Sequence, residues 1–136
     1  NLEKICPFDL VEVIRSPLPP SICGGEIYYN DKKMENWIES SEMICGMIDN
    51  VDFDVALVGA GAYAPILSSY IKNKNKSVIT TCGATQLFFG VKGKRWSKNN
   101  AKHCEVFNDS WIYPVDGDLP LNLKFFESFE GGNAYW

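Results

Sequence analysis

The 136-residue sequence has no long hydrophobic run, a single histidine and no closely spaced pair of cysteines. No apolar stretch approaches the roughly 20 residues that span a bilayer. The beginning, NLEKICPFDL, lacks the basic flank and apolar core of a signal peptide. The five cysteines are odd in number and widely spaced, which argues against a disulfide scaffold or a zinc site. These absences predict a cytoplasmic protein with reduced thiols and no membrane span.

Positive charge is also scarce, since 13 basic residues stand against 17 acidic ones. The net charge of -4 excludes a general attraction to nucleic acid or to an anionic membrane, although a local basic cluster can still bind an anion. A 46% hydrophobic chain of this length predicts one domain with one core. Because the first residue is Asn, we expect either a trimmed chain or the C-terminal part of a longer protein.

The first third of the chain predicts a strand, a loop and a helix. Residues 8–14 (FDLVEVI) are typical of a short strand, and residues 22–31 (ICGGEIYYND) of a loop. A helix is expected to begin near Asn30 or Asp31. Its apolar stripe, predicted to face the core, comprises Met34, Trp37, Ile38, Ser41, Ile44, Cys45 and Ile48.

The middle of the chain predicts a strand, a helix and a second, parallel strand. Residues 53–58 are too uniformly apolar for a half-exposed strand, which favours a central position in a parallel sheet. Pro65 suits the first turn of a helix over residues 65–72, and residues 78–81 form the next strand. We therefore predict an α/β fold: a single Rossmann-like domain over residues 1–136. Its open, mostly parallel sheet has flanking helices, giving three layers.

A glycine turn, GAGAY, follows the first of these strands. Gly-x-Gly-x-x-Ala has the outline of a dinucleotide-binding turn, but NAD sites also need an acidic residue after the second strand. No Asp or Glu occurs between Val55 and Asn100. The turn therefore predicts an anionic or polar ligand other than NAD or FAD.

The stretch CGATQLFFGVKGKRW, residues 82–96, is expected beside this turn at the ligand-binding edge of the sheet. Its basic residues, Lys92, Lys94 and Arg95, suit phosphate, and the ring of Trp96 suits a base or sugar. The predicted cleft for a nucleotide or sugar is lined by Gly59, Gly61, Tyr63, Gly83, Gln86, Lys94, Arg95 and Trp96. The alternative is a solvated hairpin with Trp96 packed inward.

Candidate metal and nucleophile sites are weak. Asp52 and Asp54 lie at the amino end of a strand, which favours capping or surface charge, and Asp116 with Asp118 is a weak loop candidate. The single histidine, His103, excludes a histidine-rich metal site and leaves no nucleophilic triad to assemble. No resident metal is predicted, and dependence on a divalent metal stays open.

Several motifs resemble those of a family encoded among bacterial and viral surface-polysaccharide genes. The family reads close to GAGAYGLPLA, GGATQLLFGIKGKRW, NEHWxRP and VEGGCYW. The corresponding text here is GAGAYAPILS, CGATQLFFGVKGKRW, NDSWIYP and EGGNAYW, so that residues 36–136 look like the family's C-terminal half. The chain departs from this pattern at Ala64-Pro65, where Gly-Leu-Pro is usual, and at Thr81-Cys82-Gly83, where His-x-Gly-Gly is common. Asn133 stands in place of a Cys.

More remotely, the order of strand, glycine turn, helix and strand is similar to the C-terminal part of GT-D class glycosyltransferases. Those enzymes use a nucleotide sugar and carry an Asp-x-Glu metal motif, which does not occur in these 136 residues. The resemblance implies a nucleotide-sugar-dependent glycosyltransferase of polysaccharide biosynthesis, or a fragment of one. The alternative is a non-catalytic nucleotide- or sugar-binding module. The C-terminal aromatics either close the core or pack a homo-oligomer.

Overall fold

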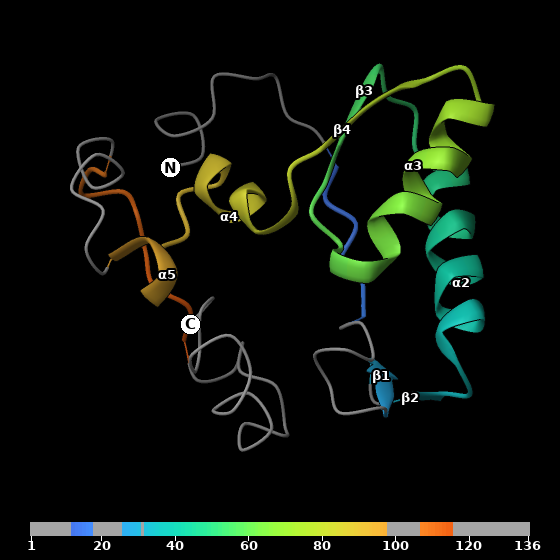
Figure 1. Cartoon of the computed structure of the whole chain (residues 1–136), viewed down its shortest axis with the longest axis horizontal. Coiled ribbons are helices and arrows are strands. Elements are labelled where there is room, and N and C mark those ends of the chain that lie inside the picture. The colour runs from blue at the N-terminus through green and yellow to red at the C-terminus, as the bar shows by residue number, and fades with distance from the viewer. Residues whose placement is uncertain (1–11, 18–25, 31, 98–106, 116–136) are drawn as a thin grey trace. The chain divides into compact units, whose positions relative to one another are not determined.

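The computed structural model describes residues 12–17, 26–30, 32–97 and 107–115. The chain divides into two compact units, Leu10–Cys82 and a second unit made of Asn1–Asp9 with Gly83–Trp136. The described elements are mixed α/β, with one antiparallel and one parallel sheet of two strands each (Figure 1). The predicted α/β class is confirmed at this level. The described residues hold no helix that is both long and apolar enough to cross a membrane.

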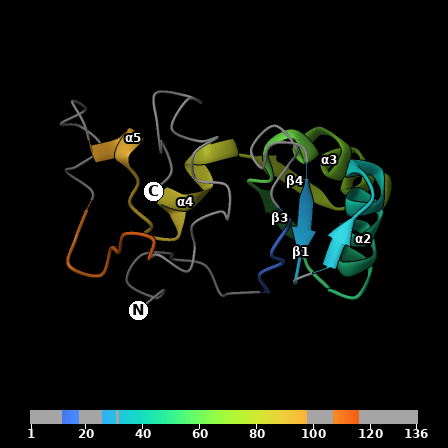
Figure 2. The same ribbon diagram turned by 90° about the horizontal axis from the view of Figure 1, so that it is seen from below.

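The first unit contains a β-hairpin where the sequence predicts a loop. Strands β1 (Ile27–Tyr29) and β2 (Lys32–Met34) pair antiparallel, with Tyr29 opposite Lys32 (Figure 2). Asn30 begins the connection with a φ of 47°, and Asn tolerates this left-handed conformation better than most residues. The loop prediction is therefore wrong for residues 27–29. The Asn-Asp pair in the sequence between residues 27–29 and 32–34 is the signal for the turn.

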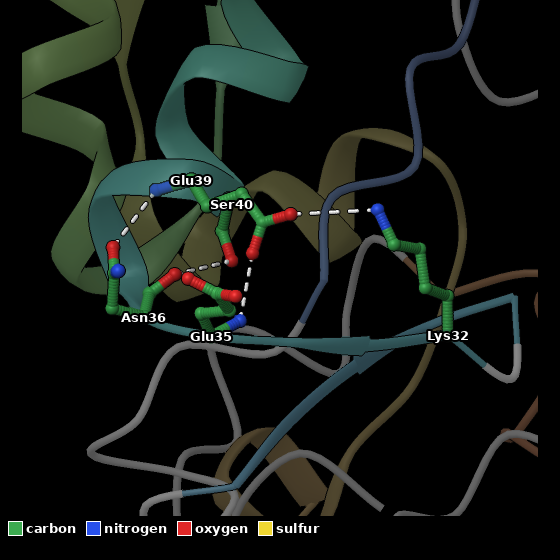
Figure 3. A network of polar contacts seen from close by, with 5 residues as sticks. All are labelled: Lys32, Glu35, Asn36, Glu39 and Ser40. Carbon is green, nitrogen blue, oxygen red and sulfur yellow. Dashed lines mark hydrogen bonds and ion pairs between the residues drawn. The ribbon is translucent and has the colours of Figure 1, made fainter.

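Helix α2 (Trp37–Asp49) begins six to seven residues later than predicted, because Asn36 caps it. The Asn36 side-chain oxygen accepts hydrogen bonds from the Ile38 and Glu39 amides at 2.9 and 3.0 Å. A Glu39 carboxylate oxygen accepts the Glu35 amide at 2.7 Å, and the other lies 3.4 Å from the Lys32 ammonium (Figure 3). Asn36-x-x-Glu39 is a capping-box pattern, which satisfies amides at the helix start.

The predicted apolar stripe of α2 is only partly buried. Ile44 and Ile48 belong to the core, as does the small side chain of Ser41 on the same face. Trp37 and Ile38 are 47% and 50% exposed, so the first turn of the stripe is not core. Met34 is buried but belongs to β2, where the capping residue Asn36 separates it from the helix.

The predicted parallel strand, helix and strand are confirmed. Strands β3 (Val55–Val58) and β4 (Ser77–Thr80) pair in parallel, with Val58 opposite Thr80. Helix α3 (Ala64–Asn73) crosses between them and carries Pro65 in its first turn (Figure 1). Proline fits there because its missing amide would have no partner inside the helix.

Helices α2 and α3 share one hydrophobic core with one face of this sheet. Leu67 and Ile71 of α3 are buried against Ile44 of α2 and Val58 of β3. Side chains alternate between the two faces of a strand, so every second side chain of β3 and β4 faces away from the helices. Val55 of β3 is 52% exposed and Ile79 of β4 is 53% exposed.

The prediction of a uniformly buried, central strand is therefore wrong for β3, which in the described part of the chain pairs with β4 alone. A third layer is not shown. Residues 12–14 of the first predicted strand are not in a strand, and residues 8–11 lie outside the described residues. His103, Asp116, Asp118 and the C-terminal aromatics also lie outside them.

The second unit contains short helices. They are α4 (Thr85–Phe88) and α5 (Lys94–Ser97). A parallel β-bridge joins Val91, which lies between the two helices in sequence, to Ile112, which follows α5. The solvated hairpin that the alternative predicted over residues 82–96 is therefore wrong. Its inward-packed Trp96 is borne out in part, because the indole nitrogen of Trp96 is buried.

Candidate functional site

The glycine turn joins the carboxyl end of β3 to the beginning of α3. A 3-10 turn, η2 (Gly61–Tyr63), leads directly into the helix, and Gly61 has a φ of 53°. Glycine adopts this left-handed conformation without steric cost, whereas a Cβ there is disfavoured. Gly59, Gly61 and Ala62 are exposed, so a ligand has access to this stretch of backbone.

The main-chain donors of the turn are partly used by the turn itself. The Tyr63 amide donates to the Ala60 carbonyl at 3.1 Å, and the Ala64 amide donates to the Gly61 carbonyl. Within the described part of the chain, the Gly61 and Ala62 amides donate to no main-chain carbonyl. Together with the positive end of the ten-residue helix α3 they form an anion-receptive edge.

Tyr63 does not form a stacking platform. Its side chain is 1% exposed and is one of the largest fully buried groups of the core. A ring that is packed on Leu67 and Ile71 stabilises the turn from below and cannot also lie flat on a base or sugar. Sequence spacing placed Tyr63 in the turn but did not indicate toward which side its ring points.

The carboxyl end of β4 carries hydroxyl groups where a dinucleotide site has an acid. The Thr80 hydroxyl lies 2.8 Å from the Ser68 hydroxyl of α3. The next amide, that of Thr81, donates to the Val58 carbonyl at 3.0 Å and extends the strand pairing. Cys82 then turns the chain with a φ of 49°. This end of the sheet is polar and uncharged.

Gly83 and Gln86 lie in the first helical turns of the second unit. Gly83 is part of the 3-10 turn Cys82–Ala84, and Gln86 is part of α4. The Gln86 side-chain amide donates to the Val91 carbonyl at 3.3 Å, while the Val91 amide donates to the Gln86 carbonyl at 2.9 Å. Gln86 therefore closes its own loop, and this amide is engaged by the chain.

Helix α5 holds the three remaining predicted site residues, Lys94, Arg95 and Trp96. Arg95 is exposed, and Trp96 is half-buried with its amide donating to the Gly93 carbonyl at 3.0 Å. Consecutive residues on a helix point in different directions, so Arg95 and Trp96 do not share one face. Of the predicted residues, Gly59, Gly61 and Tyr63 belong to the first unit, and Gly83, Gln86 and this group belong to the second.

The acidic residues that are described do not form a metal site. Asp52 is fully exposed and its carboxylate lies 3.1 Å from the Lys76 ammonium, as expected of surface charge. Among the residues that the structure describes, no three side chains of the metal-binding types gather in one place.

The thiol of Cys45 is not activated as a nucleophile. Partial burial raises the pKa of the Cys45 thiol, and the nearby carboxylates of Asp49 and Glu42 raise it further. A thiol whose pKa is raised stays protonated at neutral pH and is a poor nucleophile. Cys45 is accordingly a packing residue beside the core.

The segment Phe107–Val115 contains residues of the NDSWIYP motif that were not predicted as site residues. Asn108 forms a turn, in which its side chain accepts the Ser110 amide at 2.9 Å and its carbonyl accepts the Trp111 amide at 3.0 Å. The Phe107 and Trp111 rings stack with centroids 4.6 Å apart. The spacing Asn-x-x-Trp was visible in the sequence, but its role as a turn that brings two rings together was not.

No family model matches the chain, and no curated protein or solved structure matches it. The resemblance to the polysaccharide-gene family and to GT-D glycosyltransferases therefore stays a hypothesis. Because one fold hosts many functions, function is inferred from the chemistry of the site.

Proposed function

We propose that the chain is a nucleotide-sugar-binding, glycosyltransferase-like domain, in which the Gly59–Tyr63 turn receives the diphosphate of the donor. The observation that carries this proposal is the glycine turn at the carboxyl end of β3, which leads into α3. Ligands of open α/β sheets bind at this end of the strands, and phosphate groups bind at such helix starts.

The charge around the turn supports an anionic ligand. No acidic residue lies in the first turn of α3, and none occurs from Val55 to Asn100. A carboxylate at this edge would repel a diphosphate, whereas bare amides and the helix dipole attract it. Lys94 and Arg95 of the second unit are proposed as a separate group of phosphate contacts, and each group is tested on its own.

We further propose that the β3, α3, β4 unit belongs to a Rossmann-like, three-layer fold. The exposed apolar side chains of Val55 and Ile79 support a further layer on the sheet face opposite the helices. A cytoplasmic location, where nucleotide sugars and reduced thiols occur together, is part of the same proposal and agrees with the unpaired thiol of Cys45.

The proposal concerns binding, and sugar transfer is a separate question. In such a transfer the protein orients two substrates and stabilises the departing diphosphate. An acceptor base is not identified among the described residues, so a non-catalytic binding module remains the second candidate. Release of nucleoside diphosphate from a bound donor, in the presence of sugar acceptors, distinguishes the two.

The test is calorimetric titration of a nucleotide-sugar panel into the wild-type chain and two variants of one exposed residue, Ala62→Asp and Ala62→Asn. The carboxylate of Ala62→Asp lies in the turn and repels a diphosphate, so affinity should fall ten-fold or more. Ala62→Asn has nearly the same shape without the charge and should retain binding within about three-fold. If no panel member binds the wild type, or both variants bind equally well, the proposed diphosphate site is wrong.

A further inference from the structure

Lys92 lies between two aromatic rings in the second unit. Its ammonium nitrogen is 5.7 Å from the ring centroid of Phe107 and 5.5 Å from that of Tyr113. The backbone fixes this arrangement, because the Lys92 amide donates to the Ile112 carbonyl at 2.7 Å. The Ile112 amide in turn donates to the Gly90 carbonyl at 2.9 Å. A lysine side chain is usually free to move, whereas this one is held beside two rings.

Basic residues outnumber acidic ones in the described part of the second unit, although the whole chain is acidic. The described residues of the second unit, 83–97 and 107–115, include three basic residues, Lys92, Lys94 and Arg95, and one acidic residue, Asp109. In this part of the unit no carboxylate forms an ion pair with Lys92. The rings hold the ammonium without neutralising it, so its charge still attracts an anion.

Next to this charge lies an exposed apolar surface. Tyr113 is 54% exposed, and its neighbours Ile112 and Val115 are 62% and 66% exposed. A flat ring beside a fixed positive charge suits a small ligand that combines a planar group with negative charge. Nucleotides have this chemistry within one small molecule, whereas the Asp and Glu side chains of a peptide carry the charge without a planar ring.

We propose that Tyr113 and Lys92 bind the nucleoside end of a nucleotide, with the base stacked on the exposed ring and a phosphate at the ammonium. This inference rests on the proposed function only for the class of ligand, a nucleotide, and it concerns a surface of the second unit by itself. A polymer of nucleotides is disfavoured because the whole chain carries a net charge of -4.

The experiment titrates the 136-residue chain with ADP, GDP, CDP, UDP and inorganic pyrophosphate. Tyr113→Ala and Lys92→Met remove the ring and the charge, and Tyr113→Phe keeps the ring. Matched controls are Tyr28→Ala and Lys72→Met, which alter an exposed tyrosine and an exposed lysine of the first unit. We expect Tyr113→Ala and Lys92→Met to weaken the best diphosphate about ten-fold or more, Tyr113→Phe less than about three-fold, and the controls not at all.

Pyrophosphate separates the two contacts, because it carries the charge without a base. Its binding should weaken in Lys92→Met and stay unchanged in Tyr113→Ala. If Lys92→Met alters the near-ultraviolet circular dichroism of the folded chain, its loss of affinity could come from altered packing. The inference is then tested by comparing the affinities of Tyr113→Ala and Tyr113→Phe. Equal binding by that pair overturns the inference, and the proposed function then stands if Ala62→Asp still loses affinity. If no nucleoside diphosphate or nucleotide sugar binds the wild type, both proposals fall.

Discussion

At the scale of single residues, two glycines predict opposite effects of the same substitution. Gly61 has a φ of 53°, where a Cβ costs about 1 to 2 kcal/mol, so Gly61→Ala should destabilise the protein by that amount. Gly46 lies inside α2, and a Cβ there would have nothing within 4 Å. Gly46→Ala should therefore stabilise by about 0.5 to 1 kcal/mol, because alanine loses less backbone entropy in a helix. Urea unfolding of both variants checks the signs, and a shared sign would contradict the assigned conformations.

A second prediction at this scale concerns Arg95, which is exposed on α5. If its guanidinium contacts a donor phosphate, Arg95→Ala removes a charge-assisted hydrogen bond of about 1.5 to 3 kcal/mol. Affinity for the nucleotide sugar should then fall ten-fold or more. Lys72→Ala, which removes an exposed cation at the far end of α3, is the control. Equal affinities of the two variants would exclude Arg95 from the site.

The identity of the candidate residues could be predicted from the sequence better than their orientation. The glycine turn was placed correctly because Gly61 and Pro65 each have a local conformational reason for their position. The burial of Tyr63 and the loop-closing bond of Gln86 depend on tertiary contacts that spacing does not contain. Lys92 was visible as a charge, but its two ring partners come from residues 15 or more positions away.

At the scale of secondary-structure elements, a polar cluster joins the ends of α2 and α3. The Asp49 carboxylate accepts hydrogen bonds from the Tyr70 hydroxyl at 2.7 and 2.8 Å, and the Lys74 ammonium lies 2.5 Å from it. Lys74, and after it Tyr70, hold the pKa of Asp49 below its ordinary value of 3.8. The hydrogen bond to Asp49 likewise raises the pKa values of Tyr70 and Lys74 above 10.0 and 10.5.

These shifts predict how the stability contributed by the cluster depends on pH. A lowered folded pKa means that the Asp49 contribution is present above the ordinary value and is lost as the pH falls through the lowered one. The raised values of Tyr70 and Lys74 mean that their contribution is present below the ordinary values and is lost as the pH rises through the raised ones. Urea unfolding of wild type and Asp49→Asn should therefore differ most near neutral pH. A difference that stays constant from about pH 2 to pH 11 would contradict the assignment.

Elements with an unambiguous local sequence signal were predicted well, and elements with an ambiguous signal were not. The parallel pair β3 and β4 with α3 follows from two apolar runs, a glycine turn and Pro65. The start of α2 was misplaced because Met34 continues the apolar spacing of the helix backwards into β2. The cap at Asn36 outweighs that spacing, since it satisfies the first amides of the helix.

At the scale of the whole molecule, acidic residues are unevenly distributed along the chain. The chain carries -4 overall, but the region from Val55 to Asn100 contains no acidic residue. In the described part of the chain four carboxylates pair with lysines of the first unit, namely Glu26 with Lys33, Glu39 with Lys32, Asp49 with Lys74 and Asp52 with Lys76. The glycine turn and residues 83–97, which include Lys92, therefore contain none of the acids that would repel a phosphate.

The same distribution predicts that dinucleotides do not bind. An NAD site needs a carboxylate at the end of the second strand to hold the ribose hydroxyls. Here β4 ends at Thr80, whose hydroxyl is paired with Ser68 across to α3. NAD and FAD should accordingly give no saturable heat up to about 1 mM, a concentration at which sites of about -4 kcal/mol begin to fill. A nucleotide sugar titrated in parallel controls for the activity of the sample. A saturable NAD signal that is lost in Ala62→Asp would contradict this prediction. It would show that the turn binds dinucleotides without a carboxylate at the end of β4.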